Sequence, residues 1–592
     1  MAFQNANVAE EGKALTVSEY IFDFLHKKGV ENVYMVSGSS AMWLTDSLYR
    51  NEKLKAVCCQ HEQVAAMAAD AEGRLGRVPG VVLVTIGPGA TNAITGVAGA
   101  FTDSSPMFVI SGQANSKILK YQMDTGIRTK GTQSIVLDDV VGGVTKYFAA
   151  VLDPAEIRYH MERAYHEAMS GRKGPVWIDV PVDIQNRQIS DDMKGYNPDE
   201  IKEDVVDWGA LQKLVECSMK PLIFAGYGIL SAGVRELILS FAEKFSIPIV
   251  ASRGGIGVVP SSSRLFVGRP GAYGDRASHF AVQKCDLLLI LGSRLSQSTT
   301  GYYPDHLAPN ATKIMVDIDE KELAKGDVPI DIPIHMDLKN FAEKLMKESS
   351  KWSIQKHEDW IAYCRENVNK YPVVDLSYGK EDGINSYYFT QLLSENAPDG
   401  ATVVVDTGSV CNVVSQTWYL KEKQKYVISG GFSCMGFWAA SIGAAAYGDV
   451  IALSGDGATQ MNVQDFATLA YYKLPVKLFV YNNLGYLLIR HNQHNYMNDR
   501  FLGVGPDSGV PSVDFCAVAA AYGLTSIRIE TKEEIVSKVR EVFETDGPVI
   551  CEVMTQKFGI LAPRIASRVM PDGSLKAAEF DDLWPFLDKN QV

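Results

Sequence analysis

The cysteines of this sequence form no recognisable motif. Its 592 residues include nine cysteines, but they are scattered along the chain and no pair has CxxC spacing. This pattern excludes the usual zinc-binding motifs and a disulfide framework, and it favours a reducing compartment. The N-terminus also lacks the basic flank and apolar segment of a secretory signal. We therefore expect a cytoplasmic protein.

Positive charge and long apolar runs are also scarce. The 57 Lys and Arg residues are outnumbered by 70 Asp and Glu residues, which gives a net charge of −13. This surplus argues against a nucleic-acid partner and against an anionic membrane surface. The most apolar window, 437–454, is interrupted by Gly443, Gly448 and Asp449, so it is too broken to span a membrane. The expected partners are small-molecule substrates.

Short apolar runs alternate with helical patterns along most of the chain, which predicts an α/β fold of doubly wound parallel sheets. A chain of this length exceeds one hydrophobic core. We predict three such domains, at 14–190, 208–345 and 384–560, followed by a C-terminal tail at 561–592. The strands expected from apolar runs are 32–36, 81–86, 107–111, 176–180, 222–225, 248–251, 287–291, 313–316, 450–454 and 476–481.

Two of the predicted domains end in the same way. Gly174-Pro175 precedes the apolar run at 176–180, and Gly547-Pro548 precedes a similar run at 549–553. Each run follows a charged helical segment of similar length. Because two α/β domains that close alike are unusual by chance, the sequence suggests a duplicated module.

The segment 450–485 carries the strongest chemical signal. One expected strand ends in Gly455-Asp456-Gly457, and the next expected strand ends at Asn482-Asn483. Parallel strands bring both ends to one edge of the sheet, where open α/β folds bind ligands. Carboxylate and amide oxygens, with a nearby backbone carbonyl, suit Mg²⁺, which takes its remaining ligands from phosphates and water. The glycines and the helix that starts near Ala458 can approach those phosphates.

The first domain contains two further motifs. Glu62, in Gln60-His61-Glu62-Gln63, opens a helix of small residues, where an acidic side chain is also explained by the helix dipole. The loop Gly87-Pro88-Gly89-Ala90-Thr91-Asn92 follows a strand and resembles a phosphate-binding loop. It lacks the lysine of a P-loop, so we do not expect a nucleoside triphosphate.

Eight motifs occur in the order found in the acetohydroxyacid (acetolactate) synthases: HEQ, GPGATNAITG, Asp103-Ser104-Ser105-Pro106, SGQ, GPVWIDVPVDIQ, GGFSCMGFWAASIGAA, GDG and NN. The chain therefore resembles this group of thiamine-diphosphate enzymes, whose relatives include pyruvate oxidase and a branch that acts on nucleotide-linked keto sugars. The resemblance covers about residues 14–560. It implies a pyrimidine-binding, a central and a diphosphate-binding domain. It also implies a homodimer or homotetramer whose active sites combine the first domain of one subunit with the third of its partner.

The resemblance also implies roles for individual residues. Glu62 would hydrogen-bond the aminopyrimidine ring of the cofactor, Met435 would support the bent cofactor, and Gln113 would face the reaction centre. The implied Mg²⁺ ligands are Asp456, Asn483 and the carbonyl of Gly485. The remaining implied contacts to thiamine diphosphate are Gly408, Ser409, Ser433, Gly457 and Ala458.

The central domain resembles the flavin-binding version of the family. Residues at the positions where acetohydroxyacid synthases contact FAD, a flavin that would be structural here, are Gly226, Gly228, Gly271, Gly274, Arg294 and Asp317. Glycines and acids at strand ends also occur in α/β domains without a ligand. The usual arginine–aromatic–acidic run is replaced by Arg294-Leu295-Ser296-Gln297.

The chain leaves the acetolactate synthase pattern where the acceptor would bind. Arg490 stands in place of a tryptophan, and Ser37 stands in place of a proline in a loop that also contains Ser39. Arginine offers a charged fork suited to carboxylate or phosphate. We therefore predict transfer of a two-carbon unit from pyruvate to a larger, polar acceptor, with a nucleotide-linked keto sugar as the leading candidate.

Several alternatives stay open. Arg490 could grip the carboxylate of a second pyruvate, which is acetolactate synthesis, or could lie on an exposed helix face without a role. Pyruvate oxidase would pass electrons to FAD and oxygen instead. A catalytically inactive homologue is disfavoured, because Glu62, Asp456, Asn483 and Met435 are all retained.

Overall fold

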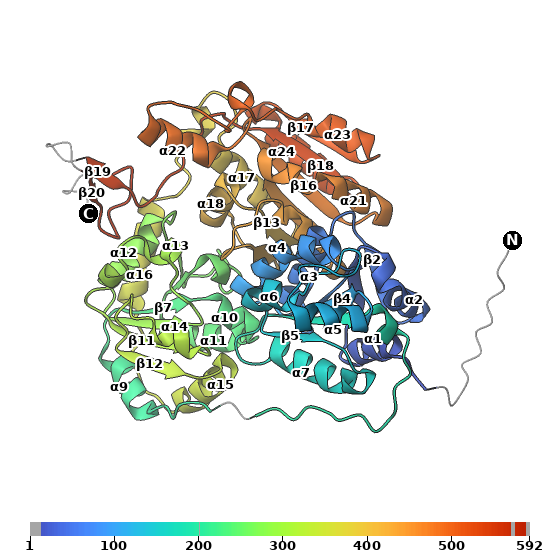
Figure 1. Cartoon of the computed structure of the whole chain (residues 1–592). Helices are drawn as coiled ribbons and strands as arrows, with labels where there is room; N and C mark the ends of the chain where they lie inside the picture. Colours follow the sequence, from blue (N-terminus) through green and yellow to red (C-terminus); the bar gives the residue numbers. More distant parts are fainter. Residues whose placement is uncertain (1–13, 200–201, 570–574, 588–592) are drawn as a thin grey trace. The chain divides into compact units, whose positions relative to one another are not determined.

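The structure is a computed structural model in which residues 14–199, 202–569 and 575–587 are described. The chain divides into two compact units, with the boundary after Glu200. The described residues form three six-stranded sheets of parallel strands and one two-stranded hairpin. In Figure 1 the first sheet is blue to cyan, the second green to yellow, and the third gold to red. This confirms the predicted fold class of parallel-sheet α/β domains.

The first unit holds one sheet with the strand order β2-β1-β3-β4-β6-β5. Its strands are β1 (Asn32–Met35), β2 (Lys55–Cys58), β3 (Gly80–Val84), β4 (Met107–Gln113), β5 (Tyr147–Ala150) and β6 (Pro175–Pro181). Its helices are α1 (Val17–Lys27), α2 (Met42–Arg50), α3 (Glu62–Leu75), α4 (Pro88–Thr102), α5 (Ser116–Thr125), α6 (Asp138–Val141), α7 (Ile157–Met169) and α8 (Val182–Gln185).

Small residues let α3 and α4 pack closely. A Cβ added to Gly96 of α4 would lie 2.5 Å from the Cβ of Ala66 on α3, so a larger side chain at either position would push the helices apart. The side chain of His61 caps α3 by accepting a hydrogen bond from the Gln63 N–H at 3.1 Å. These contacts fix the start of α3, where Glu62 lies.

The second sheet lies in the second unit and has the order β12-β11-β10-β7-β8-β9. Counted along the chain from β7, this is the 3-2-1-4-5-6 order of dinucleotide-binding sheets. Its strands are β7 (Pro221–Ala225), β8 (Ile249–Ala251), β9 (Phe266–Gly268), β10 (Leu287–Leu291), β11 (Thr312–Asp317) and β12 (Ile332–His335). The helices of this part are α9 (Trp208–Cys217), α10 (Tyr227–Ser231), α11 (Arg235–Phe245), α12 (Arg276–Lys284), α13 (Gln297–Thr300), α14 (Glu320–Ala324), α15 (Leu338–Ser349) and α16 (Glu358–Lys370).

The third sheet has the order β14-β13-β15-β16-β18-β17. Its strands are β13 (Thr402–Val405), β14 (Lys425–Ile428), β15 (Val450–Gly455), β16 (Val476–Asn482), β17 (Thr525–Ile529) and β18 (Val549–Met554). The helices are α17 (Ser386–Asn396), α18 (Ser409–Thr417), α19 (Ser441–Ala444), α20 (Asp456–Gln460), α21 (Phe466–Tyr472), α22 (Leu487–Met497), α23 (Phe515–Ala521) and α24 (Ile535–Glu544). The sequence predicts one helical segment after Asp456, but the structure has α20, a 3-10 turn (Val463–Asp465) and α21.

The first and third sheets share one topology. When the strands of each are numbered in chain order, both sheets read 2-1-3-4-6-5. The closing strands β6 and β18 occupy the same place in this order; β6 begins at Pro175 of its Gly-Pro pair, and β18 begins directly after Pro548. The common topology supports the duplicated module inferred from the sequence.

The strands named from the sequence all lie within two residues of their expected bounds. Within the three sheets, the strands that the sequence did not reveal are β13 and the six edge strands β2, β5, β9, β12, β14 and β17. Interior strands such as β10 (LLLIL) are buried at every position, whereas edge strands such as β2 (KAVC) mix buried and exposed residues. Edge strands therefore carry a weaker apolar signal.

The described part of the C-terminal tail packs against α12 of the second unit. The ring of His279 stacks on Phe580 at 4.1 Å, and Arg276 donates a hydrogen bond to the Leu583 carbonyl at 3.0 Å. Strands β19 (Ser567–Val569) and β20 (Leu575–Ala577) form the hairpin. No helix of the described residues is both long and apolar enough to cross a membrane.

Candidate active site

The carboxyl edge of the third sheet brings together the predicted metal ligands. Strands β15 and β16 are direct neighbours, so Asp456 and Asn483 follow adjacent strand ends. One oxygen of Asp456 accepts the Gly485 N–H at 2.6 Å, and the other accepts the Gly457 N–H at 2.9 Å. Burial raises the pKa of Asp456 to about 6, although these hydrogen bonds lower it. The carboxylate therefore holds the loop after β16 against the start of α20.

The Asn483 side chain fits a metal ligand. Its Oδ1 atom is buried and has no hydrogen-bond partner among the described residues. A buried amide oxygen without a partner is costly, and a cation is one way to satisfy it. Gly485 follows with φ +129°, and a Cβ at this position would overlap the Val504 carbonyl. An acid, an amide and a loop carbonyl form a donor set of the kind that Mg²⁺ accepts.

Arg490 of α22 binds backbone carbonyls, whereas the sequence predicts a contact with the acceptor substrate. Its side chain is 3% exposed. The guanidinium donates hydrogen bonds to four backbone carbonyls, those of Asn483, Leu484, Val504 and Lys557. Four of its five N–H groups are therefore bonded to carbonyls of the loops around the predicted metal ligands. The expected grip on an acceptor carboxylate or phosphate gains no support from this geometry, and the expected exposed face is not found.

The residues predicted to line the diphosphate lie at the ends of β13 and β15. The switch point of the sheet, where the strand order reverses, lies between these neighbouring strands. Gly408 has φ +80°, and Ser409 then begins α18. Gly457 and Ala458 lie in α20, where Ala458 is 6% exposed. Both helices thus begin at this edge.

The loop of Met435 is fixed by two polar side chains. Ser433 has φ +53° and Gly436 has φ +89°, so the loop makes a tight, irregular turn on each side of Met435. The amide of Asn462 donates to the Gly436 carbonyl at 3.0 Å. The carboxylate of Asp406 accepts the Trp438 N–H at 3.1 Å.

Asp406 is a structural centre of this edge that the sequence did not reveal. It is 1% exposed at the end of β13, and it accepts hydrogen bonds from the Thr407 N–H at 2.8 Å and the Ser454 hydroxyl at 2.8 Å. Together with the bond from Trp438, these contacts join the loop after β13 and the end of strand β15 to the Met435 loop. Burial raises its pKa to about 6. An aspartate directly after an apolar strand was the available signal.

In the first unit, Glu62 accepts a hydrogen bond from the amide of Asn92 on α4 at 3.0 Å. The other carboxylate oxygen lies close to Gly89, where an added Cβ would be 3.4 Å away. The two sequence motifs, HEQ and GPGATN, therefore meet at the starts of α3 and α4. Ser37 and Ser39 follow β1 and are at least partly exposed at the same carboxyl edge.

Gln113 belongs to a buried hydrogen-bond network. Its amide donates to Asp179 at 2.9 Å and to the Ile135 carbonyl at 3.1 Å, and its carbonyl accepts the Ala114 N–H at 2.9 Å. The Ser111 hydroxyl donates to the other oxygen of Asp179 at 2.5 Å. Both amide hydrogens of Gln113 are thus engaged within the domain, and its expected place at the reaction centre stays a prediction.

In the central sheet, the predicted flavin contacts lie at strand ends. Gly226 after β7 packs on the Gly292 carbonyl after the neighbouring strand β10, and Gly228 donates to that carbonyl at 3.0 Å. Gly271 has φ +152° and donates to the ring of His279 at 3.1 Å, and a Cβ added to Gly274 would lie 2.6 Å from the same ring. The two other predicted contacts, Arg294 and Asp317, follow β10 and end β11.

Family models for three consecutive domains match this chain. The N-terminal thiamine pyrophosphate binding domain matches residues 15–140, the central domain of thiamine pyrophosphate enzymes matches 209–345, and the C-terminal thiamine pyrophosphate binding domain matches 406–553. The chain belongs to the thiamine-diphosphate enzymes of the acetolactate synthase and pyruvate oxidase family.

Relatives of this thiamine-diphosphate enzyme extend over nearly its whole length. A protein of Methanocaldococcus jannaschii described as a probable acetolactate synthase large subunit is 30% identical, over 97% of this chain and 99% of its own. The acetolactate synthase large subunit of Lactococcus lactis is 30% identical, over 95% and 96%. That of Haemophilus influenzae is 30% identical, over 91% and 94%. The enzyme is therefore acetolactate synthase-like and uses thiamine diphosphate.

Proposed function

We propose that this enzyme is an acetolactate synthase, which removes CO₂ from one pyruvate and joins the remaining two-carbon unit to a second pyruvate. The observation that carries the proposal is the near full-length similarity to acetolactate synthase large subunits from three organisms. The engagement of Arg490 adds support, because the charged fork expected for a larger acceptor is already bonded to backbone carbonyls.

The residues at the two carboxyl edges suit the parts of the cofactor. Thiamine diphosphate supplies, when bound, the reactive carbon that removes CO₂ from a 2-keto acid and carries its two-carbon unit. Asp456, Asn483 and the Gly485 carbonyl would hold Mg²⁺, which neutralises the diphosphate. The Glu62 carboxylate would accept or return the proton of the aminopyrimidine ring nitrogen. The loops at Gly408, Ser409, Ser433, Met435, Gly457 and Ala458 would bind and orient the remaining atoms.

The central domain would bind FAD. Two features support this part of the proposal: the strand order of the sheet, and the meeting of Gly226 with Gly292 at its switch point. Purified enzyme should then be yellow and should release flavin on denaturation. With pyruvate it should consume little oxygen, because the flavin would not accept electrons. Rapid oxygen consumption would favour pyruvate oxidase.

The active sites would be shared between subunits of a homodimer or homotetramer. Mixing two inactive variants, Glu62→Gln and Asp456→Ala, tests this arrangement. If each site combines the first domain of one subunit with the third domain of its partner, a mixed dimer regains one intact site. Random mixing of equal amounts should restore about a quarter of the wild-type activity. No recovery in verified mixed dimers would refute the sharing of residues between subunits.

Product analysis tests the function directly. With pyruvate as the sole substrate, Mg²⁺ and thiamine diphosphate, the enzyme should form acetolactate and CO₂ in equal amounts. Mass spectrometry of reactions that also contain aldehydes, other keto acids or nucleotide-linked keto sugars measures the preference for the acceptor. The proposal fails if CO₂ is released rapidly only when a non-pyruvate acceptor is present, or if no 2-keto acid is decarboxylated.

A further inference from the structure

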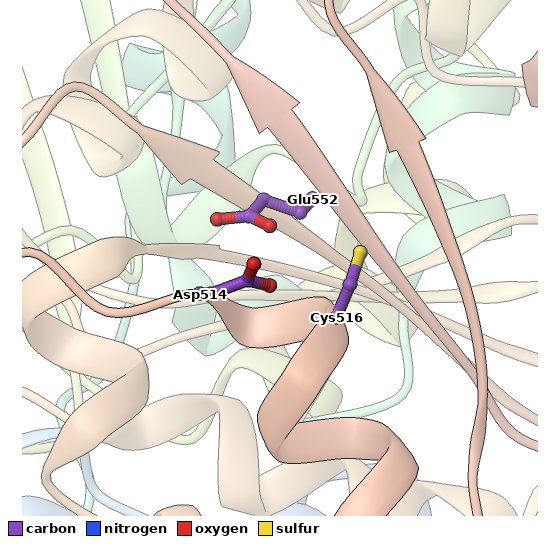
Figure 2. A group of neighbouring side chains, drawn as sticks. All are labelled: Asp514, Cys516 and Glu552. Carbon is purple, nitrogen blue, oxygen red and sulfur yellow. The ribbon is translucent and has the colours of Figure 1, made fainter.

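A second carboxylate lies beside the metal-ligand loop, on the neighbouring strand. Glu552 of β18 is 1% exposed, and Arg528 of β17 is its direct partner in the strand register. Asp514 and Cys516, at the start of α23, point toward Glu552 (Figure 2). The ligand-type atoms of these three residues lie within 4.8 Å of one another. The grouping alone is that of a possible metal centre.

An arginine already supplies the positive charge of this cluster. Arg528 donates from Nε to Glu552 at 3.0 Å, and its Nη2 atom pairs with both Glu552, at 2.9 Å, and Asp514. A metal ion would have to displace the guanidinium from both carboxylates. We therefore assign the cluster to ion pairing, which keeps the buried Glu552 carboxylate compensated.

The other oxygen of Glu552 controls the orientation of Asn482. The Asn482 amide nitrogen donates to Glu552 at 2.7 Å, while the amide oxygen accepts the Leu484 N–H at 3.1 Å. An ionised carboxylate can only accept hydrogen bonds, so it requires the NH₂ end of the amide to face it. The oxygen then necessarily faces the loop.

This orientation matters because the loop is held in an uncommon conformation. Leu484 has φ +60°, in the left-handed region that residues other than glycine adopt only at an energetic cost. The turn closed by the Asn482 side chain compensates for that cost. The next N–H, of Gly485, donates to Asp456 at 2.6 Å. A continuous chain of contacts thus runs from Arg528 through Glu552 and Asn482 to the predicted metal ligands.

We propose that Glu552 and Arg528 are positioning residues for the loop 483–485 and act by fixing the orientation of the Asn482 amide. The inference rests on the proposed Mg²⁺ role of this loop. A glutamine at position 552 cannot serve both neighbours: if its oxygen accepts from Arg528, its NH₂ group meets the NH₂ group of Asn482. Asn482 must then rotate, which turns its NH₂ toward the Leu484 N–H and opens the turn.

The Glu552→Gln variant tests this role, because it preserves size while removing the acceptor-only carboxylate. Binding of thiamine diphosphate is titrated with Mg²⁺ and followed by protein fluorescence. The Mg²⁺ concentration at half-saturation should rise roughly tenfold to a hundredfold, as for other residues that orient metal ligands. In metal-free protein, hydrogen exchange of the Leu484 and Gly485 amides should become faster.

A double variant separates orientation from general damage. In Glu552→Gln/Asn482→Asp, the introduced glutamine accepts from Arg528 and donates to the introduced aspartate, which still accepts from the Leu484 N–H. The hydrogen bonds that join Arg528, residue 552, residue 482 and the Leu484 N–H are satisfied again, with the direction reversed between residues 552 and 482. Only the long bond from the Asn482 amide to the Val513 carbonyl, at 3.5 Å, is lost. Slow exchange at Leu484 and Gly485 should return, and so should most of the Mg²⁺ affinity. The single change Asn482→Asp places two carboxylates together. This variant should show neither the slow exchange at Leu484 and Gly485 nor the Mg²⁺ affinity of the wild type.

The control variant is Asp103→Asn. Arg74 forms ion pairs with both Asp70 and Asp103, so this change also removes one carboxylate from a buried arginine that has two carboxylate partners. This variant should lose thermal stability with no change in the Mg²⁺ titration. Unchanged titration and exchange in Glu552→Gln, or a double variant no better than the single one, would overturn the inference. If the wild-type enzyme shows no Mg²⁺-dependent cofactor binding, the proposed function fails instead, and the exchange rates of metal-free protein decide the inference.

Discussion

The buried carboxyl group of Asp179 should make the stability of the first unit depend on pH. Asp179 is 1% exposed and lies between the Ser111 hydroxyl and the Gln113 amide. Burial raises its pKa from 3.8 to about 7, against the two hydrogen bonds that lower it. In the unfolded chain the same group has an ordinary pKa near 3.9.

The sign of the effect follows from where the proton binds more tightly. Between these two pKa values the folded state is protonated at Asp179, whereas the unfolded state is not. The stabilising contribution is therefore fully present below about pH 4 and is lost as the pH rises through about 7. From pH 5 to pH 8 the loss spans about two pKa units, which corresponds to about 2.7 kcal/mol.

The Asp179→Asn variant removes this titration while keeping the size of the side chain. Urea unfolding of both proteins at pH 5 and pH 8 gives the free energy of unfolding at each pH. Relative to wild type, the variant should gain about 2.7 kcal/mol between pH 5 and pH 8. Trp177, which donates to Ser111 at 2.8 Å, offers a local fluorescence signal. A stability difference that is the same at both pH values would refute the argument.

Three further predictions concern the site itself. Gly485→Ala should raise the Mg²⁺ concentration at half-saturation of cofactor binding at least tenfold, because the new Cβ overlaps the Val504 carbonyl. The control Gly509→Ala, at a glycine with φ +100° and open space around its Cβ, should leave this concentration unchanged. Arg490→Met should lower the free energy of unfolding, measured in urea, by about 3 kcal/mol, because buried carbonyls lose their hydrogen-bond donors. A variant that is as stable as the wild type but binds the acceptor substrate more weakly would instead support a role of Arg490 in acceptor binding. Glu62→Gln should bind cofactor and remain folded by circular dichroism, yet release no CO₂ from pyruvate; near wild-type turnover would exclude its role in proton transfer.

The order of apolar runs and turns was enough to predict the parallel α/β domains and every interior strand except β13. Interior strands are covered on both faces, so their sequences are largely apolar, as in β10 (LLLIL) and the first four residues of β15 (VIALSG). The same reasoning placed Asp456 and Asn483 at two strand ends, and the structure shows that those strands are adjacent. Local sequence carries this information because strand burial acts on consecutive residues.

Tertiary structure decided the features that depend on residues far apart in the chain. The edge strands are recognisable only after the sheet has formed, since their mixed patterns are also typical of loops. Arg490 looked like a ligand for substrate because its sequence position gave its charge but not its surroundings, which are carbonyls from three loops. The partners of Glu552, on β16 and β17, were equally hidden. Sequence determines which groups are present, but only folding decides which of them a buried charge meets, because desolvation makes that charge bind the nearest compensating group.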